Sequence, residues 1–301
     1  MRKERTLRNW VIAARPWSLP ASLVPIAATA AYILSYARHA GTECNWPAAV
    51  MCLAVMVLFH SGANLIGDHS DYMKKVDLPG SPNGVFWIYD GTFTAEEVLR
   101  YGIVLIAAAC VIGLWLVALT DISLLWLGVA GCALAFLYPW FKAHRLGDMD
   151  ILLSFAILPS LGMGLVVTKS CLWQAVAISL TYGLLTLSIL QANNTRDILN
   201  DSRAGISTLC MWMGTRQSRW LYAAEVTGAF LLTVTLVCLG VMPVYSLAVA
   251  LTLPSAINNC RKMLSSEENG DSINALDQQS AQLQLAFGTI LTLSFIVDAL
   301  L

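Results

Sequence analysis

The chain has 301 residues, of which 57% are hydrophobic and 12% are charged, and its formal net charge is −1. Soluble globular proteins carry about 25% charged residues, so this composition excludes a soluble domain and predicts an integral membrane protein. Such a chain gives no reason to expect a nucleic-acid partner. The eight cysteines form no CxxC pair, and we interpret them as small buried hydrophobic residues.

Apolar stretches of about 18 to 22 residues are long enough to cross a bilayer as helices. They predict an all-α polytopic membrane protein with nine transmembrane helices, at 17–36, 46–67, 98–119, 122–140, 151–168, 171–193, 220–240, 241–258 and 281–299. The seventh and eighth stretches are divided only around Gly240 to Pro243. The basic head and apolar run at the N-terminus resemble a signal peptide, but the run is long and contains Pro16, Pro20 and Pro25. We therefore expect the first span to be retained.

The distribution of Lys and Arg around these nine spans is strongly one-sided. Sixteen lie on the side of the N-terminus, and only Arg38 and Lys169 lie on the other side. Cytoplasmic loops are enriched in Lys and Arg, so the N-terminus is predicted to be cytoplasmic and the C-terminus to lie outside. The connections 68–97, 194–219 and 259–280 on the cytoplasmic side are long and polar. We expect the chemistry on that face.

The most polar stretch that directly follows an apolar run is Gln191 to Leu209, with the sequence QANNTRDILNDSRAGISTL. Asn193, Asp197 and Asp201 are spaced i, i+4 and i+8, so on a helix they share one face. The preceding run, Cys171 to Leu190, contains no charged residue. The stripe formed by Asn193, Asp197 and Asp201 is therefore predicted at the end of a membrane helix.

A second acidic stripe ends the second predicted span. Asn64, Asp68 and Asp71 follow helical spacing, and Asp77 comes six residues later. Both acidic spans run from outside to inside, which predicts that the two motifs meet at the same depth. Carboxylates clustered at a membrane boundary need cations. Oxygen ligands favour Mg²⁺ completed by substrate phosphate, so we predict a Mg²⁺ and diphosphate site.

These motifs, together with Ala14 to Pro20 (ARPWSLP), resemble the UbiA superfamily of intramembrane prenyltransferases. Within it the chain is most similar to the 1,4-dihydroxy-2-naphthoate polyprenyltransferases of menaquinone synthesis. The resemblance covers the whole chain and implies a single domain, 1–301, with one motif in each half (about 1–145 and 146–301). In two places the chain departs from that family: Ile206 stands where a Lys is usual, and Leu78 to Gly91 matches its glycine- and arginine-containing loop poorly.

The resemblance implies helices around a central cavity and Mg²⁺-dependent transfer of a polyprenyl group from an allylic diphosphate to an aromatic acceptor. The residues that we expect to act as catalytic metal ligands are Asp68, Asp71, Asp197 and Asp201, with Asn64 and Asn193 as helpers. The diphosphate needs cationic donors, for which Arg196, Lys142 and Arg145 are the candidates, although each also suits a membrane-side anchor.

Three further roles concern the acceptor and the carbocation. Arg15 is a candidate for binding an acceptor carboxylate, or for anchoring the first helix. Tyr138 is placed to face the carbocation. His69 either acts on the acceptor hydroxyl or faces solvent, whereas His60 is expected to be a packed polar residue.

Two other interpretations stay open from the sequence. Within the prenyltransferases the acceptor is alternatively 4-hydroxybenzoate or another aromatic ring. Intramembrane carboxylates also mark ion pathways, which makes a membrane ion or solute transporter the alternative of another class. The enzyme is expected in the inner (cytoplasmic) membrane, with its active site facing the cytoplasm.

Overall fold

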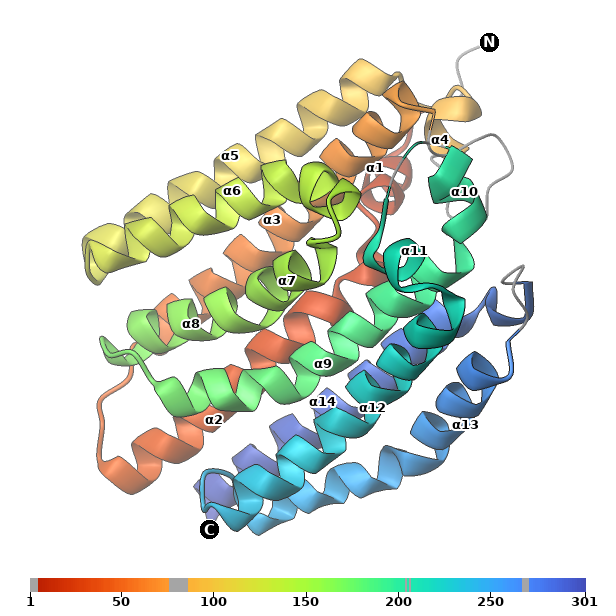
Figure 1. Ribbon diagram of the computed structural model, residues 1–301. Coiled ribbons are helices and arrows are strands. Elements are labelled where there is room, and N and C mark those ends of the chain that lie inside the picture. The colour runs from red at the N-terminus through yellow and green to blue at the C-terminus, as the bar shows by residue number, and fades with distance from the viewer. Residues whose placement is uncertain (1–4, 76–85, 204, 206, 267–270) are drawn as a thin grey trace.

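The computed structural model describes residues 5–75, 86–203, 205, 207–266 and 271–301, and the described chain folds as a bundle of helices. Lipid offers no hydrogen-bond partners, so a spanning chain satisfies its backbone within helices. Figure 1 shows the long helices side by side, with α1 near one end of the bundle and the C-terminus at the other. The long helices are α2 (Pro20–Ala40), α3 (Trp46–Met73), α5 (Ala95–Leu119), α6 (Ser123–Ala143), α9 (Trp173–Arg196), α12 (Thr215–Cys238) and α14 (Leu276–Leu300). The shorter elements are α1 (Leu7–Ala13), η1 (Pro16–Ser18), α4 (Phe86–Tyr89), α7 (Gly147–Leu152), the π-helical η2 (Leu153–Ile157), α8 (Leu158–Thr168), α10 (Ile198–Arg203), α11 (Leu209–Met213), η3 (Val244–Thr252), α13 (Leu253–Leu264) and η4 (Asp271–Ile273).

Eight helices in the described residues are long and apolar enough to cross a membrane, and they confirm eight of the nine predicted spans. One of them, Gly147–Thr168, joins α7, η2 and α8. The predicted span 241–258 has a different form, because η3 is a 3₁₀ helix and only α13 continues as an α-helix. Pro254 lies in the first turn of α13. A proline has no N–H with which to continue an α-helical hydrogen-bond ladder out of η3, and its fixed φ suits the first turn of a new α-helix.

The centre of the bundle is α9, which contacts α2, α7, α12 and α14. In its apolar window 72% of the residues are buried, against 6% in α6, so α6 lies at the periphery. Tyr182 and Tyr222 are fully buried. Their hydroxyls lie 2.6 Å from Thr29 Oγ1 and 2.7 Å from Ser280 Oγ. The buried phenols are therefore satisfied within the core.

Two local features determine where the acidic end of α3 lies. Gly62 in α3 and Gly102 in α5 allow close approach, because a Cβ on Gly102 would lie 2.9 Å from the carbonyl oxygen of Gly62. At the N-terminus, Arg15 adopts a left-handed conformation with φ of 54° and separates α1 from η1. Non-glycine residues rarely adopt this conformation. The turn brings the Arg15 side chain to α3.

Candidate active site

The first acidic motif lies at the end of α3, close to the turn at Arg15. Asp68 is 3% exposed, and its carboxylate forms an ion pair with the Arg15 guanidinium. That guanidinium also lies over the ring of Trp87, 5.6 Å from its centroid. Asn64 donates a hydrogen bond of 2.9 Å to Ser18 Oγ. The first motif is thus held against η1. Asp77 lies outside the described residues.

The second motif spans the end of α9 and the start of α10. The predicted single helix face is interrupted, because α9 ends at Arg196 and Asp197 is its C-cap. Backbone hydrogen bonds nevertheless link Asp197 N to Asn193 O at 3.0 Å and Asp201 N to Asp197 O at 2.8 Å. The four-residue spacing therefore continues through the break, and Asp201 comes to lie on α10. Ile206 lies outside the described residues.

The two motifs meet around Lys142, at the end of α6. Its Nζ lies 3.2 Å from Asp201 Oδ1, and Asp201 is buried. Asp71 lies within electrostatic reach of both Lys142 and Asp201. Tyr138, one turn before Lys142, lies within electrostatic reach of Asp71 and Asp201 as well. The structure thus brings together a carboxylate from each motif, a lysine and a phenol.

At Asp201 the effect of burial outweighs that of the positive charge beside it. Burial raises the pKa of the Asp201 carboxyl, and the neighbouring Lys142 ammonium opposes that rise. Its Oδ2 is buried and has no hydrogen-bond partner among the described residues. A buried acceptor without a partner costs about 1–3 kcal/mol, so it favours a bound cation or donor.

Arg196 is more enclosed than a diphosphate-binding arginine was expected to be. Its side chain is 6% exposed and forms two hydrogen bonds of 2.8 Å to Asp197, one through Nε and one through Nη2. Nη1 lies 2.8 Å from Asp277 at the start of α14, and Nη2 also donates to Asn193 Oδ1. In this arrangement Arg196 connects α9 to α14, and both oxygens of Asp197 are engaged. Asp277 was missed by the sequence analysis, in which no pattern linked it to Arg196.

Arg145 and His69 do not join the cluster around Lys142 in a contact that the structure describes. Arg145 has φ of 68°, and its guanidinium lies over Trp212, 5.7 Å from the ring centroid. His69 is half-buried. Both keep their predicted roles only as hypotheses.

Mg²⁺ is compatible with the oxygen ligands at this end of the bundle. Within the described residues no three His, Cys, Asp or Glu side chains stand ready to hold a metal ion. Arg15 and Lys142 instead supply the positive charge beside Asp68 and Asp201. The free Oδ2 of Asp201 and the carboxylate of Asp71 are ligands of the kind that Mg²⁺ accepts, alongside water and phosphate. The residues therefore fit a metal that binds together with its substrate.

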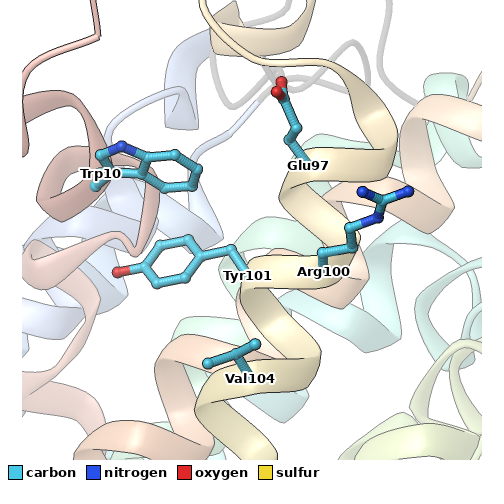
Figure 2. A pocket seen from close by; sticks show the side chains of 5 residues that line it. All are labelled: Trp10, Glu97, Arg100, Tyr101 and Val104. Atoms are coloured by element: carbon cyan, nitrogen blue, oxygen red, sulfur yellow. The ribbon is translucent and has the colours of Figure 1, made fainter.

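A hollow on the outside of the bundle lies away from these residues. It has a volume of about 270 Å³ and is lined by Trp10 of α1 and by Glu97, Arg100, Tyr101 and Val104 of α5 (Figure 2). None of the site residues predicted from the sequence lines it.

Comparison with known proteins identifies the family. The model of the UbiA prenyltransferase family matches residues 10–278. The human protein UbiA prenyltransferase domain-containing protein 1 is 32% identical over 290 residues, which are 93% of this chain and 81% of that protein. Its Drosophila melanogaster homolog is 29% identical over 94% of this chain and 78% of its own length.

Solved structures of low sequence identity share the fold. A UbiA homolog from Aeropyrum pernix K1 in its apo form superposes with a TM-score of 0.69 at 18% identity, covering 91% of this chain and 97% of that one. A UbiA homolog from Archaeoglobus fulgidus bound to GPP and Mg²⁺ gives a TM-score of 0.65 at 16% identity, covering 94% and 99%. The chain belongs to the UbiA prenyltransferase family.

Proposed function

We propose that this prenyltransferase transfers a polyprenyl group from an allylic diphosphate to an aromatic acceptor in a Mg²⁺-dependent reaction. The observation that carries the proposal is the meeting of the two acidic motifs around Lys142, where Asp201 lies 3.2 Å from the lysine and Asp71 lies within electrostatic reach of both. The Archaeoglobus fulgidus homolog, solved with GPP and Mg²⁺, supports the choice of ligands.

In this proposal Asp68, Asp71, Asp197 and Asp201 would hold Mg²⁺, which would supply positive charge to the departing diphosphate. Lys142 donates to a diphosphate oxygen from its place beside Asp201. Tyr138 presents its ring to the carbocation from the same helix. Each oxygen of Asp197 accepts one hydrogen bond from Arg196 and keeps a second lone pair, with which it would bind the ion.

The acceptor that we propose is 1,4-dihydroxy-2-naphthoate, in menaquinone biosynthesis. The similarity of Asn193 to Leu209 and of Ala14 to Pro20 to that group of enzymes supports it. Arg15 suits an acceptor carboxylate, because its guanidinium lies between Asp68 and the face of Trp87. 4-Hydroxybenzoate, which also carries a carboxylate and a ring hydroxyl, is the second candidate.

We also propose nine membrane crossings, with the site facing the cytoplasm. Helices η3 and α13 together contain 21 residues, which rise about 36 Å at 2.0 Å and 1.5 Å per residue. Figure 1 shows the C-terminus at the far end of the bundle from α1, as an odd number of crossings requires. The concentration of Lys and Arg on the side of the N-terminus supports the orientation, and the inner membrane is its expected location.

The transporter interpretation predicts carboxylates near the middle of the membrane, on broken helices. Here the two motifs lie at the ends of α3 and α9, where Figure 1 places α1, α4 and α10 as well. Prenyl transfer uses carboxylates at such a boundary, where diphosphate arrives from water and the chain enters lipid.

The test uses membranes that contain the protein, labelled farnesyl diphosphate, Mg²⁺ and each candidate aromatic acid. The wild type should form a prenylated product with one of them. Asp71→Asn and Asp201→Asn should lower the rate by at least about 100-fold. Glu43→Gln, which changes an exposed acid in the loop between α2 and α3, is the control and should keep the wild-type rate. Intact diphosphate and no product with any acceptor would refute the proposed function.

A further inference from the structure

His60 is a buried residue on the acidic face of α3 that the proposed reaction leaves without a role. It lies one turn before Asn64 and is 8% exposed. Its Nε2 lies 2.9 Å from Ser18 Oγ. Ser18 Oγ also donates to the Arg15 carbonyl oxygen at 2.8 Å and accepts from Asn64 Nδ2 at 2.9 Å. His60 is thus part of the network that holds η1 against α3.

The contacts of Ser18 support one assignment of the hydrogen on the His60 ring. A serine hydroxyl has one hydrogen, and that of Ser18 is used by the Arg15 carbonyl. We therefore assign the ring hydrogen to Nε2, which donates to Ser18 Oγ at 2.9 Å. In a neutral imidazole the other nitrogen, Nδ1, is then an acceptor. His60 Nδ1 is buried and has no hydrogen-bond partner among the described residues.

The position of this acceptor atom suits an aromatic substrate. His60, Asn64 and Asp68 repeat every four residues, so His60 lies about 12 Å along the helix from the acidic end, toward the membrane interior. Phe155, on the π-helical segment η2, packs edge to face against the imidazole with ring centroids 5.5 Å apart. Arg15, whose carbonyl oxygen belongs to the network, pairs with Asp68. The Phe155 ring and the unpartnered Nδ1 of His60 thus lie farther toward the membrane interior than the pair of Arg15 and Asp68.

We propose that His60 Nδ1 accepts a hydrogen bond from a ring hydroxyl of the aromatic acceptor and orients that ring toward the prenyl carbocation. The ligand class is a phenol or naphthol. This inference rests on the proposed function, because it assigns a residue to the acceptor of that reaction. The hydrogen bond holds the ring in place, and no proton is transferred to His60.

Two substitutions distinguish the role of Nδ1 of His60 from that of Nε2. In His60→Gln the side-chain amide reaches the position of Nε2 and can still donate to Ser18, but nothing replaces Nδ1. In His60→Asn the amide lies near Nδ1 and the contact with Ser18 is lost. His60→Gln should raise KM for the aromatic acceptor by about 10-fold or more, because the hydroxyl loses its partner in a buried site. KM for the prenyl diphosphate should change less than about twofold.

If His60 serves only to hold Ser18, the order of effects reverses. His60→Gln then keeps wild-type KM values, and His60→Asn is the damaged variant. That outcome overturns the inference. A wild type that makes no product with any acceptor instead refutes the proposed function, so the two failures are distinguishable.

A second measurement compares ligands, and its deciding result comes from the wild type alone. The acceptor that gives product with the wild type is compared, as a competitive inhibitor, with each of its mono-O-methyl ethers. One ether should bind the wild type about 10-fold more weakly than its hydroxyl parent, and His60→Gln should bind the two alike. Equal binding of every ether and its parent to the wild type would overturn the inference, even if the variants fail to fold.

Discussion

Arg196 offers the sharpest test of how the second motif is held. Its guanidinium bridges Asp197 and Asp277, and the side chains of Arg196 and Asp277 are 6% and 15% exposed. Arg196→Gln and Asp277→Asn, made singly and together, form a double-mutant cycle across the α9 to α14 contact.

The expected energies follow from burial and distance. Opposite charges about 4 Å apart attract by roughly 4 kcal/mol at an effective dielectric constant near 20. Desolvation of both groups offsets part of this, but removal of one partner from a buried pair costs about 3–5 kcal/mol. We expect Arg196→Gln to lower the free energy of unfolding by about 3 kcal/mol or more, since it leaves both carboxylates. Asp277→Asn should cost less, because Arg196 keeps Asp197. The coupling between the two changes should be about 1.5–3 kcal/mol.

The assay is equilibrium unfolding of the purified protein in detergent micelles, followed by the fluorescence of its ten tryptophans. Glu96 and Arg100 provide a matched control, because they pair at 3.7 Å in α5 with 81% and 78% of their side chains exposed. Their cycle should give less than about 0.5 kcal/mol. A coupling below that value for Arg196 and Asp277 would refute the structural role. So would an Arg196→Gln protein of wild-type stability that has lost its activity, which would return Arg196 to the diphosphate.

Three further predictions concern packing, a buried carboxyl and ion binding. Gly102→Ala should destabilise the fold by about 1–3 kcal/mol in thermal unfolding, because its Cβ would meet the Gly62 carbonyl oxygen at 2.9 Å. The control is Gly113→Ala in the same helix, where a Cβ would have nothing within 4 Å and the change should be neutral or slightly stabilising. Equal effects of the two changes would contradict this packing. Glu225→Met should raise the melting temperature by the equivalent of about 1–2 kcal/mol. The reason is that Glu225 Oε2 is buried without a partner among the described residues and lies near Asp148. A lower melting temperature would show that the carboxyl stabilises the fold. Mg²⁺ and inorganic diphosphate together, at about 100 times their dissociation constant, should stabilise the wild type by about 2.7 kcal/mol and the Asp201→Asn variant much less. The measurement is a thermal shift with and without a chelator. Equal shifts in both proteins would remove Asp201 from the ion site.

Much of the architecture was predictable because lipid imposes a simple rule on the chain. Apolar runs must be helices of spanning length, and helical spacing groups polar residues on a face. Asn64, Asp68 and Asp71 could therefore be assigned to one stripe before the fold was known. The counting of crossings also predicted that the stripes of α3 and α9 meet, and Asp71 and Asp201 do so around Lys142.

The remaining features depend on contacts that leave no periodic signal. The pair of Arg196 and Asp277 joins residues 81 positions apart, and no spacing rule reaches that far. Arg15 was open between two roles, because its left-handed conformation and its pairing with Asp68 result from how η1 packs on α3. The 3₁₀ form of η3 was equally hidden, since apolar content is similar for both helix types. In each case tertiary packing overrides the local pattern.

Arg15 and Lys142 compensate the buried acids at this end of the bundle. Asp68 and Asp201 are both almost fully buried, and a buried carboxylate without a cation is costly. Asp68 pairs with Arg15 and Asp201 pairs with Lys142, and the two basic residues come from different parts of the chain. In the proposed reaction Asp68 and Asp201 would hold Mg²⁺, whose charge would neutralise them, and Arg15 and Lys142 would then bind the anionic groups of the substrates. Because the ion alone would compete with both basic residues, whereas diphosphate attracts them, Mg²⁺ should bind far more strongly with diphosphate than by itself.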